Sequence, residues 1–354
     1  MKAIRYHCYG GHDVLVHEDA DRPVAGAGQV VVQVAGTAFN PTDAAIRAGL
    51  LQDVIPVAFP HIPNTDVAGV ITKVGDGVTG WSVGDAVVAF LPASAPGGAA
   101  EYVAAPAEAL AAAPRTGELA DAAALPLPGL TAWQSLFEHA GLKPGQVLLV
   151  NGAGGAVGGY AVQLAVQAGA IVTATASTRS RDRIHSYGPD RIVDYTAIAV
   201  QHAVAGQRFD VVLNLAHTTP EEIAQLVDLV SDGGTFVSIT TPPDARTTPA
   251  GRGVRAVQAF VRSDADQLAE LVARVDSGAL AIEVAERLPL SDLAAVHARY
   301  GVQLAELVEL VARVDDGPRG ARAVEMAERL RADLATVDAR TAAGRLAGKT
   351  VLTP

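Results

Sequence analysis

Cysteine is almost absent from this chain: Cys8 is the single cysteine among 354 residues. One thiol cannot form a disulfide framework, nor a zinc or iron–sulfur site that needs several cysteines. We therefore expect a protein of a reducing compartment that works without a bound metal. A metal site of another kind would have to combine His61 with Asp66, and His61 is explained more simply as a loop residue between two prolines.

Positive charge and long apolar runs are also scarce. The 27 lysines and arginines are outnumbered by 38 aspartates and glutamates, which gives a net charge of -11. An acidic surface repels phosphate backbones, so we expect no nucleic-acid partner. The apolar stretch 161–176 contains glutamines and a glycine and is too short to span a bilayer, and residues 1–11 lack the apolar run of a signal peptide. We therefore expect no membrane association and a cytoplasmic location.

Hydrophobic residues make up 49% of the chain, which is enough to build a large core and excludes a disordered protein. The first third of the chain consists of short valine-rich runs bounded by glycine, proline and aspartate, a pattern typical of a β-barrel or β-sandwich. We predict a β-rich domain over residues 1–121, with strands at 29–35, 67–74, 83–90 and 102–106.

From about residue 122 the chain alternates between continuous apolar runs and segments with helical spacing. Such alternation predicts a parallel sheet with right-handed crossover helices. We therefore predict an α/β fold, with a doubly wound parallel sheet over residues 122–262 beside the β-rich domain. The expected strands are 146–150, 170–176, 191–195, 209–213 and 235–239, and the expected helices are 130–140, 157–167 and 220–230.

The C-terminal region contains an internal repeat with a period of about 40 residues. The sequence Leu-Val-Ala-Arg-Val-Asp occurs at 271–276 and again at 310–315. We assign residues 263–354 to the β-rich domain, with a strand at 281–290, and predict a duplicated helical insertion at about 301–340. Three roles fit the insertion: a packed duplication relic, an oligomer surface, or a lid. A helix pair cannot bury two apolar stripes alone.

The strongest local motif is Asn-Gly-Ala-Gly-Gly-Ala-Val-Gly at residues 151–158, which follows a predicted buried strand and opens a predicted helix. Ala153, Gly155 and Gly158 occupy the three small-residue positions of a dinucleotide-binding turn. These positions allow a tight turn, close approach of a pyrophosphate and close helix packing. The helix N-terminus adds N–H groups and a partial positive charge. We predict cofactor contacts at Ala153, Gly154, Gly155, Ala156 and Val157.

The end of the next predicted strand indicates which dinucleotide binds. An NAD site usually carries an acidic residue there to hold the ribose 2′-hydroxyl. This chain instead has Ser177, Arg179 and Arg181, and arginines suit the 2′-phosphate of NADPH. We predict NADPH as the cofactor, with contacts from Ser177 and Arg179. The alternative is that these arginines only lie at the solvent-exposed start of a helix and do not bind a cofactor.

Further stretches occur in a characteristic order along the chain. They are residues 36–43 (GTAFNPTD), 63–70 (PNTDVAGV), 83–87 (VGDAV), 100–103 (AEYV), 129–133 (GLTAW) and 348–352 (GKTVL). With the glycine-rich turn, this set resembles the zinc-independent medium-chain dehydrogenases/reductases of the quinone oxidoreductase type. The resemblance covers residues 1 to about 300 and the last dozen residues.

The resemblance implies a GroES-like catalytic domain, completed by the C-terminal segment, and a Rossmann domain, with the active site in the cleft between them. It also implies hydride transfer from NADPH to a quinone or an α,β-unsaturated carbonyl, and a homodimer. Asn40, Pro41 and Asp43 match the family's stretch beside the nicotinamide, so Asn40 and Asp43 are assigned to catalysis. The remaining cofactor contacts assigned through the resemblance are Pro41, Thr131, Tyr195, Asn214, Ile239 and Lys349.

Two departures from the family pattern bear on the chemistry. Family members often carry a tyrosine soon after the segment that ends at Gly49, where this chain has Leu50 and Leu51. The proton would then come from water, or the substrate would differ. Asn64 stands where the family has a glycine, and asparagine also tolerates left-handed backbone.

Hydride delivery to an enone or quinone needs less polarisation than delivery to a ketone, because conjugation spreads the negative charge. A few hydrogen-bond donors then suffice. Asn40 is the expected orienting group; alternatively, it only caps a turn before Pro41. Two other functions stay open: a pathway-specific enoyl reductase of secondary metabolism, and a non-catalytic NADPH-binding protein used for interaction or sensing.

Overall fold

The computed structural model describes residues 1–240, 243, 251–300 and 349–354. The chain divides into two compact units. Unit 1 comprises Met1–Leu127, Ser263–Ser277 and Val284–Pro354, and unit 2 comprises Pro128–Arg262 and Gly278–Glu283. The domain boundaries expected from the sequence are 121 and 262. The helical insertion predicted at about 301–340 lies outside the described residues.

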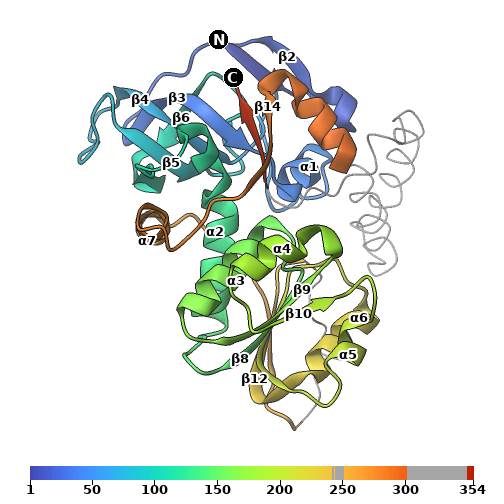
Figure 1. Ribbon diagram of the computed structural model, residues 1–354. Helices are drawn as coiled ribbons and strands as arrows, with labels where there is room; N and C mark the ends of the chain where they lie inside the picture. Colours follow the sequence, from blue (N-terminus) through green and yellow to red (C-terminus); the bar gives the residue numbers. More distant parts are fainter. Residues whose placement is uncertain (241–242, 244–250, 301–348) are drawn as a thin grey trace. The chain divides into compact units, whose positions relative to one another are not determined.

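Unit 1 is built on a sheet in which seven strands are described (Figure 1). Their order is β14-β15-β3-β4-β5-β7, and β6 pairs with β3. A separate ribbon pairs β1 with β2. The strands are β1 (Lys2–Arg5), β2 (Val16–Asp19), β3 (Gln29–Ala38), β4 (Asp66–Val74), β5 (Ala86–Phe90), β6 (Tyr102–Pro106), β7 (Leu110–Ala112), β14 (Val284–Pro289) and β15 (Lys349–Thr353).

The valine-rich runs of the first third form the strands that their composition predicts. Branched side chains from β3, β4 and β5 are buried together in one core, since they fit the pleated surface of a sheet. They include Val30, Val32, Val67, Ile71 and Val87. The expected strand at 83–90 starts later, at Ala86, because Gly84 turns the chain at a φ of 99°. The other three strand predictions of this region are confirmed.

The last strand of the chain joins the middle of this sheet. β15 runs parallel to β14 and antiparallel to β3, with Val351 opposite Ala38. Since β15 begins with Lys349 and β3 leads into Phe39 and Asn40, this pairing brings together residues that lie 310 positions apart in the chain. The site described below is built at this junction.

Two helices of unit 1 are α1 (Pro41–Arg47) and α7 (Ala265–Asp276). The N-cap of α7 is Asp264, which accepts a 3.0 Å hydrogen bond from the Gln267 N–H. Short 3-10 turns also occur at His12–Val14, Ala107–Ala109, Leu119–Ala124 and Leu290–Asp292.

The helix predicted at 130–140 differs from the one observed. Helix α2 (Pro126–Trp133) starts earlier, and a π-helical segment (Gln134–His139) follows it. Prolines are tolerated in the first turn of a helix, which explains why Pro126 and Pro128 do not delay its start. No helix in the described part of the chain is long and apolar enough to cross a bilayer.

Unit 2 contains a parallel sheet in which six strands are described, in the order β10-β9-β8-β11-β12-β13. This is the doubly wound order, in which the chain moves from β8 to one edge and returns at β11 to build the other. The strands are β8 (Val147–Asn151), β9 (Ile171–Ala176), β10 (Arg191–Asp194), β11 (Phe209–Asn214), β12 (Val230–Ser238) and β13 (Arg255–Gln258), and the helices are α3 (Ala156–Gln167), α4 (Thr178–Ser186), α5 (Val200–Ala203) and α6 (Pro220–Asp228).

The doubly wound parallel sheet predicted from the alternating pattern is therefore confirmed. Its core includes buried side chains from β8, β11, β12 and α6: Leu149, Phe209, Val212, Ile223, Leu226 and Phe236. The strand expected at 235–239 is longer than predicted and begins at Val230. A glycine at this position is typical of a turn. Gly233 adopts a left-handed φ of 75°, and the strand continues through it as an irregular step.

Candidate functional site

The turn from β3 into α1 carries Asn40 and Asp43, the two residues assigned to catalysis. Asn40 is the N-cap of α1, and its backbone N–H donates a 2.7 Å hydrogen bond to Asp43 Oδ2. Pro41 follows as the first helical residue, a position where its missing N–H costs nothing. The alternative interpretation of Asn40 as a cap before Pro41 thus holds for its backbone. Its side chain makes a different set of contacts.

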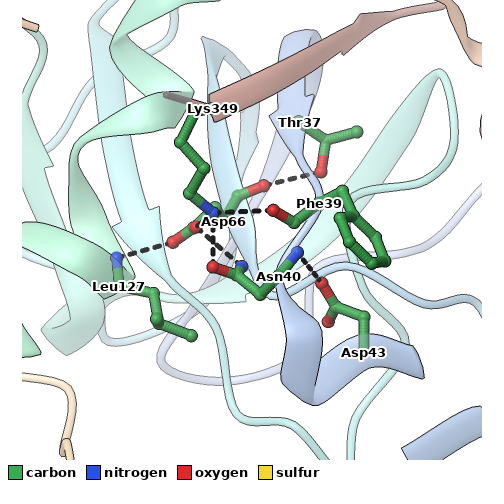
Figure 2. A network of polar contacts seen from close by, with 7 residues as sticks. All are labelled: Thr37, Phe39, Asn40, Asp43, Asp66, Leu127 and Lys349. Atoms are coloured by element: carbon green, nitrogen blue, oxygen red, sulfur yellow. Dashed lines mark hydrogen bonds and ion pairs between the residues drawn. The ribbon is translucent and has the colours of Figure 1, made fainter. Parts of the chain in front are cut away.

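The Asn40 side chain lies between a lysine and an aspartate (Figure 2). Its Oδ1 accepts a hydrogen bond from Lys349 Nζ, and its Nδ2 donates a 2.9 Å hydrogen bond to Asp66 Oδ2. The two opposite charges orient the amide, with its oxygen toward the ammonium and its NH2 toward the carboxylate. An amide NH2 has two hydrogens. The Asn40 side chain also forms a hydrogen bond with the Asp43 carboxyl, which acts to lower the pKa of that carboxyl.

Lys349 is the buried cation of this network. Its Nζ donates hydrogen bonds to Phe39 O at 2.9 Å, to Asp66 Oδ2 at 3.2 Å and to Asn40 Oδ1. An ammonium has three hydrogens, so these three oxygens use all of them. Lys349 was predicted as a cofactor contact from its place in the C-terminal motif. The structure directs its ammonium toward the turn from β3 into α1.

Asp66 completes the network as its buried anion. Besides the two contacts to Oδ2, its Oδ1 accepts a 2.7 Å hydrogen bond from the Leu127 N–H, and its backbone oxygen accepts one of 2.6 Å from Thr37 Oγ1. Burial raises the pKa of Asp66 and lowers the pKa of Lys349, and in each case the partner's charge opposes the shift. A buried ion pair persists only where its remaining lone pairs are satisfied, and here they are.

Asp43 is a buried acid on the neighbouring helix. Burial raises the pKa of its carboxyl to about 7, although the Asn40 N–H and the Lys349 charge work in the opposite direction. A carboxyl that titrates near neutral pH can hold and release a proton under working conditions. This property fits the assignment of Asp43 to catalysis.

In unit 2, the glycine-rich turn has the geometry of an anion site. Gly155 is the N-cap of α3, and no side chain caps this helix end. A Cβ placed on the exposed Gly155 would meet only Gly152 O, at 3.6 Å, so the space in front of the helix is open. By contrast, a Cβ on Gly158 would lie 2.4 Å from Gly152 O. These positions fit the pyrophosphate approach and close packing expected of them.

One detail of that motif needs correction. The tight turn was assigned to Ala153, the first small residue of the pattern. In the structure the left-handed residue is Gly152, at a φ of 94°, and Ala153 is a buried residue behind it. Gly152 has this role because its N–H donates a 2.8 Å hydrogen bond to Thr175 Oγ1, which pulls the turn toward β9.

The strand order reverses between β8 and β11, and in doubly wound sheets ligands bind at this switch point. Asn151 and Asn214 lie opposite each other there, and Asn151 Nδ2 donates a 2.8 Å hydrogen bond to Asn214 Oδ1. Asn214 Nδ2 also donates to Thr218 Oγ1 at 3.0 Å. Asn214 was predicted as a ribose or adenosine contact, and its buried side chain is engaged within the sheet end. Asn151 and Thr175 were not singled out from the sequence.

The start of α4 carries the residues predicted to select NADPH. Ser177 is the N-cap of α4, and Arg179 is exposed in its first turn. Arg183, which the sequence analysis missed, donates a 2.6 Å hydrogen bond to Gly154 O and so ties α4 to the glycine-rich turn. Tyr195, just after β10, is 45% exposed and accessible to a ligand.

The two remaining predicted contacts lie elsewhere in unit 2. Thr131 is buried in α2. Ile239 follows β12, and its N–H donates a 3.2 Å hydrogen bond to Asn214 O. Ile239 is therefore at the same sheet end as Asn214.

His61 and Asp66, the pair considered for a metal site, make other contacts. The Asp66 oxygens are engaged by the network above, and burial lowers the pKa of His61 to about 4 as its ring packs against Tyr6. Among the described residues there is no group of three or more His, Cys, Asp or Glu placed to hold a metal ion.

A β-rich unit with a buried polar network and a doubly wound unit with an open glycine-rich turn define a nucleotide-dependent dehydrogenase. Residues 26–115 match the alcohol dehydrogenase GroES-like domain, and residues 187–302 match the zinc-binding dehydrogenase family. The GroES-like identity expected for the β-rich part is thus confirmed.

Comparison with individual proteins narrows this class. The chain is 34% identical to a chloroplast envelope quinone oxidoreductase homolog of Arabidopsis thaliana, over 82% of this chain and 92% of that protein. It is 34% identical to an NADPH-dependent alkenal/one oxidoreductase of the same plant, over 72% and 67%. The quinone oxidoreductase of Coxiella burnetii has the same fold, with a TM-score of 0.79 at 24% identity, covering 100% of this chain and 99% of that one.

The chain therefore belongs to the medium-chain dehydrogenase/reductase family, among the relatives of the quinone oxidoreductases, and is an oxidoreductase. The resemblance drawn from the sequence motifs is confirmed.

Proposed function

We propose that this protein is a zinc-independent, NADPH-dependent oxidoreductase that reduces a small quinone or α,β-unsaturated carbonyl. The observation that carries the proposal is the open N-terminus of α3 at Gly155, since it offers unshielded N–H groups to a pyrophosphate. The names of the relatives supply the substrate class.

Different residues of unit 2 would contact different parts of the cofactor. The backbone of Gly154, Gly155, Ala156 and Val157 would hold the pyrophosphate. Ser177 and Arg179 would hold the 2′-phosphate, and Tyr195 would contact the adenosine side. When bound, NADPH supplies the hydride.

Unit 1 contributes a set of oriented donors. The amide of Asn40 is held by its N–H on Asp66 and by its oxygen on the Lys349 ammonium. A preorganised donor of this kind stabilises the oxyanion that develops as a quinone or enone accepts hydride. The Lys349 ammonium cannot do this itself, because its three hydrogens are already used. Its role is to orient Asn40.

The test is oxidation of NADPH and of NADH by the purified protein, with an ortho-quinone and with an α,β-unsaturated ketone. We expect turnover that prefers NADPH and is unchanged by a chelator. Saturable NADPH binding without turnover of either substrate would favour a dedicated enoyl reductase or a non-catalytic role. Absence of binding by either cofactor would contradict the proposal.

We also propose that the protein acts as a homodimer in the cytoplasm, which rests on the family resemblance and on the sequence features described above. Light scattering of the purified full chain would test the dimer, and a monomeric mass would contradict it. Fractionation of the source cells would test the location.

A further inference from the structure

A small polar cavity lies in unit 1 beside α1. Its volume is about 10 Å³, which is room for about one water molecule. Tyr6, Asp43, Asn64 and Thr65 are among the residues that line it, and its rim includes the half-buried Ala93. Asp43 lines this cavity and also accepts the Asn40 N–H in the network of Figure 2.

Three of the lining side chains end in buried polar atoms that lack a hydrogen-bond partner among the described residues. They are the Tyr6 hydroxyl, both polar atoms of the Asn64 amide and the Thr65 hydroxyl. A buried polar group left unsatisfied costs about 1–3 kcal/mol. Three such residues on one cavity of this size therefore indicate a bound polar molecule with the dimensions of water, which accepts and donates hydrogen bonds.

The cavity walls are rigid, which a binding site requires. Tyr6 and His61 exchange two backbone hydrogen bonds, of 3.0 and 2.9 Å, and the Tyr6 ring packs edge-on against Phe59 and His61. Asn64 is held at a φ of 72°, as its tolerance for left-handed backbone predicts. It is the one non-glycine residue with a positive φ among the residues described, and such strain is characteristic of functional sites.

Asp43 is the acidic residue among those that line this cavity. One of its oxygens, Oδ2, accepts the Asn40 backbone N–H. Burial raises the pKa of Asp43 to about 7, and the charged groups that act on it are Lys349, which lowers the pKa, and Asp66, which raises it. Tyr6 and Arg47 also interact with this carboxyl, since the pKa of Tyr6 is raised by burial and by Asp43 and lowered by Arg47.

We propose that this cavity is a proton relay: a water molecule held by Tyr6, Asn64 and Thr65 delivers the proton that completes reduction of an α,β-unsaturated carbonyl, and Asp43 returns a proton to that water. The relay would replace the tyrosine that is missing after Gly49. This proposal rests on the proposed function.

Hydride from NADPH adds to the β-carbon and leaves NADP+ and an enolate. The enolate then takes a proton from the relay water, so a C–H bond forms at the α-carbon as a water O–H bond breaks. The water regains a proton from the Asp43 carboxyl, which becomes a carboxylate and is reprotonated from solvent. Tyr6, Asn64 and Thr65 are positioning residues in this scheme, because they act through the water.

The experiment compares Tyr6→Phe with the wild-type protein and with Tyr102→Phe, the same change at a half-buried strand position away from the cavity. With saturating NADPH and an enone, we expect Tyr6→Phe to lower kcat by about 10-fold, less than the roughly 10²- to 10⁴-fold that general acid catalysis contributes, because Asp43 is retained. The solvent deuterium isotope effect on kcat should rise. Reduction of an ortho-quinone should fall much less, because a hydroquinone anion can leave and take its proton from bulk water.

Stability provides the second readout. The Tyr6 hydroxyl has no partner among the described residues, so a merely structural role predicts that Tyr6→Phe keeps or raises the unfolding temperature and keeps activity. Thr65→Val is the second isosteric test, and Asn64→Gly removes the amide while preserving the positive φ. Asp43→Asn should remove the limb of the kcat–pH profile near pH 7, as well as an infrared carboxyl band that titrates there.

Several outcomes would overturn the relay. The first is a kcat and an isotope effect that are unchanged from the wild type in both Tyr6→Phe and Thr65→Val. The second is deuterium added equally to both faces of the α-carbon when the wild-type protein turns over in D2O. A wild-type protein that oxidises no NADPH with either substrate would instead overturn the proposed function and the relay with it. Failure of the relay alone is recognised by full turnover in the variants.

Discussion

The ammonium of Lys349 lies 3.2 Å from the carboxylate of Asp66, and both side chains are buried. Asn40 bridges the same two groups through the two ends of its amide. The last strand of the chain thus supplies the charge that orients a side chain at the end of β3. The turn from β3 into α1 therefore depends on a contact with the last strand.

Lys349→Met should destabilise the protein by about 3–5 kcal/mol, because it leaves the Asp66 carboxylate buried without its countercharge. Urea unfolding at neutral pH measures this loss. The matched control is Lys2→Met, which breaks an ion pair with Asp19 whose two side chains are 54% and 81% exposed. Exposed pairs contribute at most about 1 kcal/mol. Equal losses in both variants would show that the buried pair has no special role.

Asp43 should make stability depend on pH. Its pKa in the folded protein is raised to about 7, whereas an unfolded aspartate titrates at about 3.9. Between these values the folded state binds a proton that the unfolded state has lost. The contribution of Asp43 to stability is therefore full below about pH 4 and is lost as the pH rises through 7, at roughly 1.4 kcal/mol per pH unit.

Asp43→Asn removes this titration but keeps an oxygen that can accept the Asn40 N–H. The measurement is the free energy of unfolding of both proteins at pH 5, 6, 7 and 8, taken as the difference between them. We expect the wild type to lose stability relative to the variant from pH 5 to 7, and the difference to become constant at pH 8. A difference that is flat across the series would place the pKa of Asp43 in its ordinary range.

These contacts mark the limit of what the sequence could predict. Strand and helix positions depend on local periodicity, so the valine runs of β3 and β4 and the glycine-rich turn before α3 were found correctly. The Asn40–Lys349 contact joins residues 309 positions apart, and no local pattern reports such a contact. Asn40, Pro41 and Asp43 do carry the signature of a helix start, and it was included in the sequence analysis as the alternative that Asn40 caps a turn before Pro41.

Substitutions at two glycines of the dinucleotide turn should affect NADPH binding and protein stability separately. A Cβ at Gly155 meets only one atom, at 3.6 Å, whereas a Cβ at Gly158 would lie 2.4 Å from a backbone oxygen. Gly155→Ala should therefore fold with a nearly unchanged melting temperature and bind NADPH at least about 10-fold more weakly, a loss of about 1.4 kcal/mol. Gly158→Ala should lower the melting temperature.

NADPH fluorescence titration and thermal unfolding of the two variants give both quantities. Unchanged NADPH affinity in Gly155→Ala would show that the pyrophosphate does not approach the backbone at this turn. A Gly158→Ala protein as stable as the wild type would show instead that α3 can shift away from the turn.

Cofactor choice should depend on Arg179. Its guanidinium is exposed in the first turn of α4, so its removal leaves the fold intact and takes away only a partner for the 2′-phosphate. A hydrogen bond to a charged group contributes about 1.5–3 kcal/mol, so Arg179→Ala should weaken NADPH binding by roughly 10- to 100-fold and leave NADH binding unchanged. The control is Arg183→Ala: Arg183 holds Gly154 O, and its loss should disturb the turn that both cofactors share. Equal weakening of NADPH and NADH in Arg179→Ala would contradict the assignment, because only NADPH carries the extra phosphate.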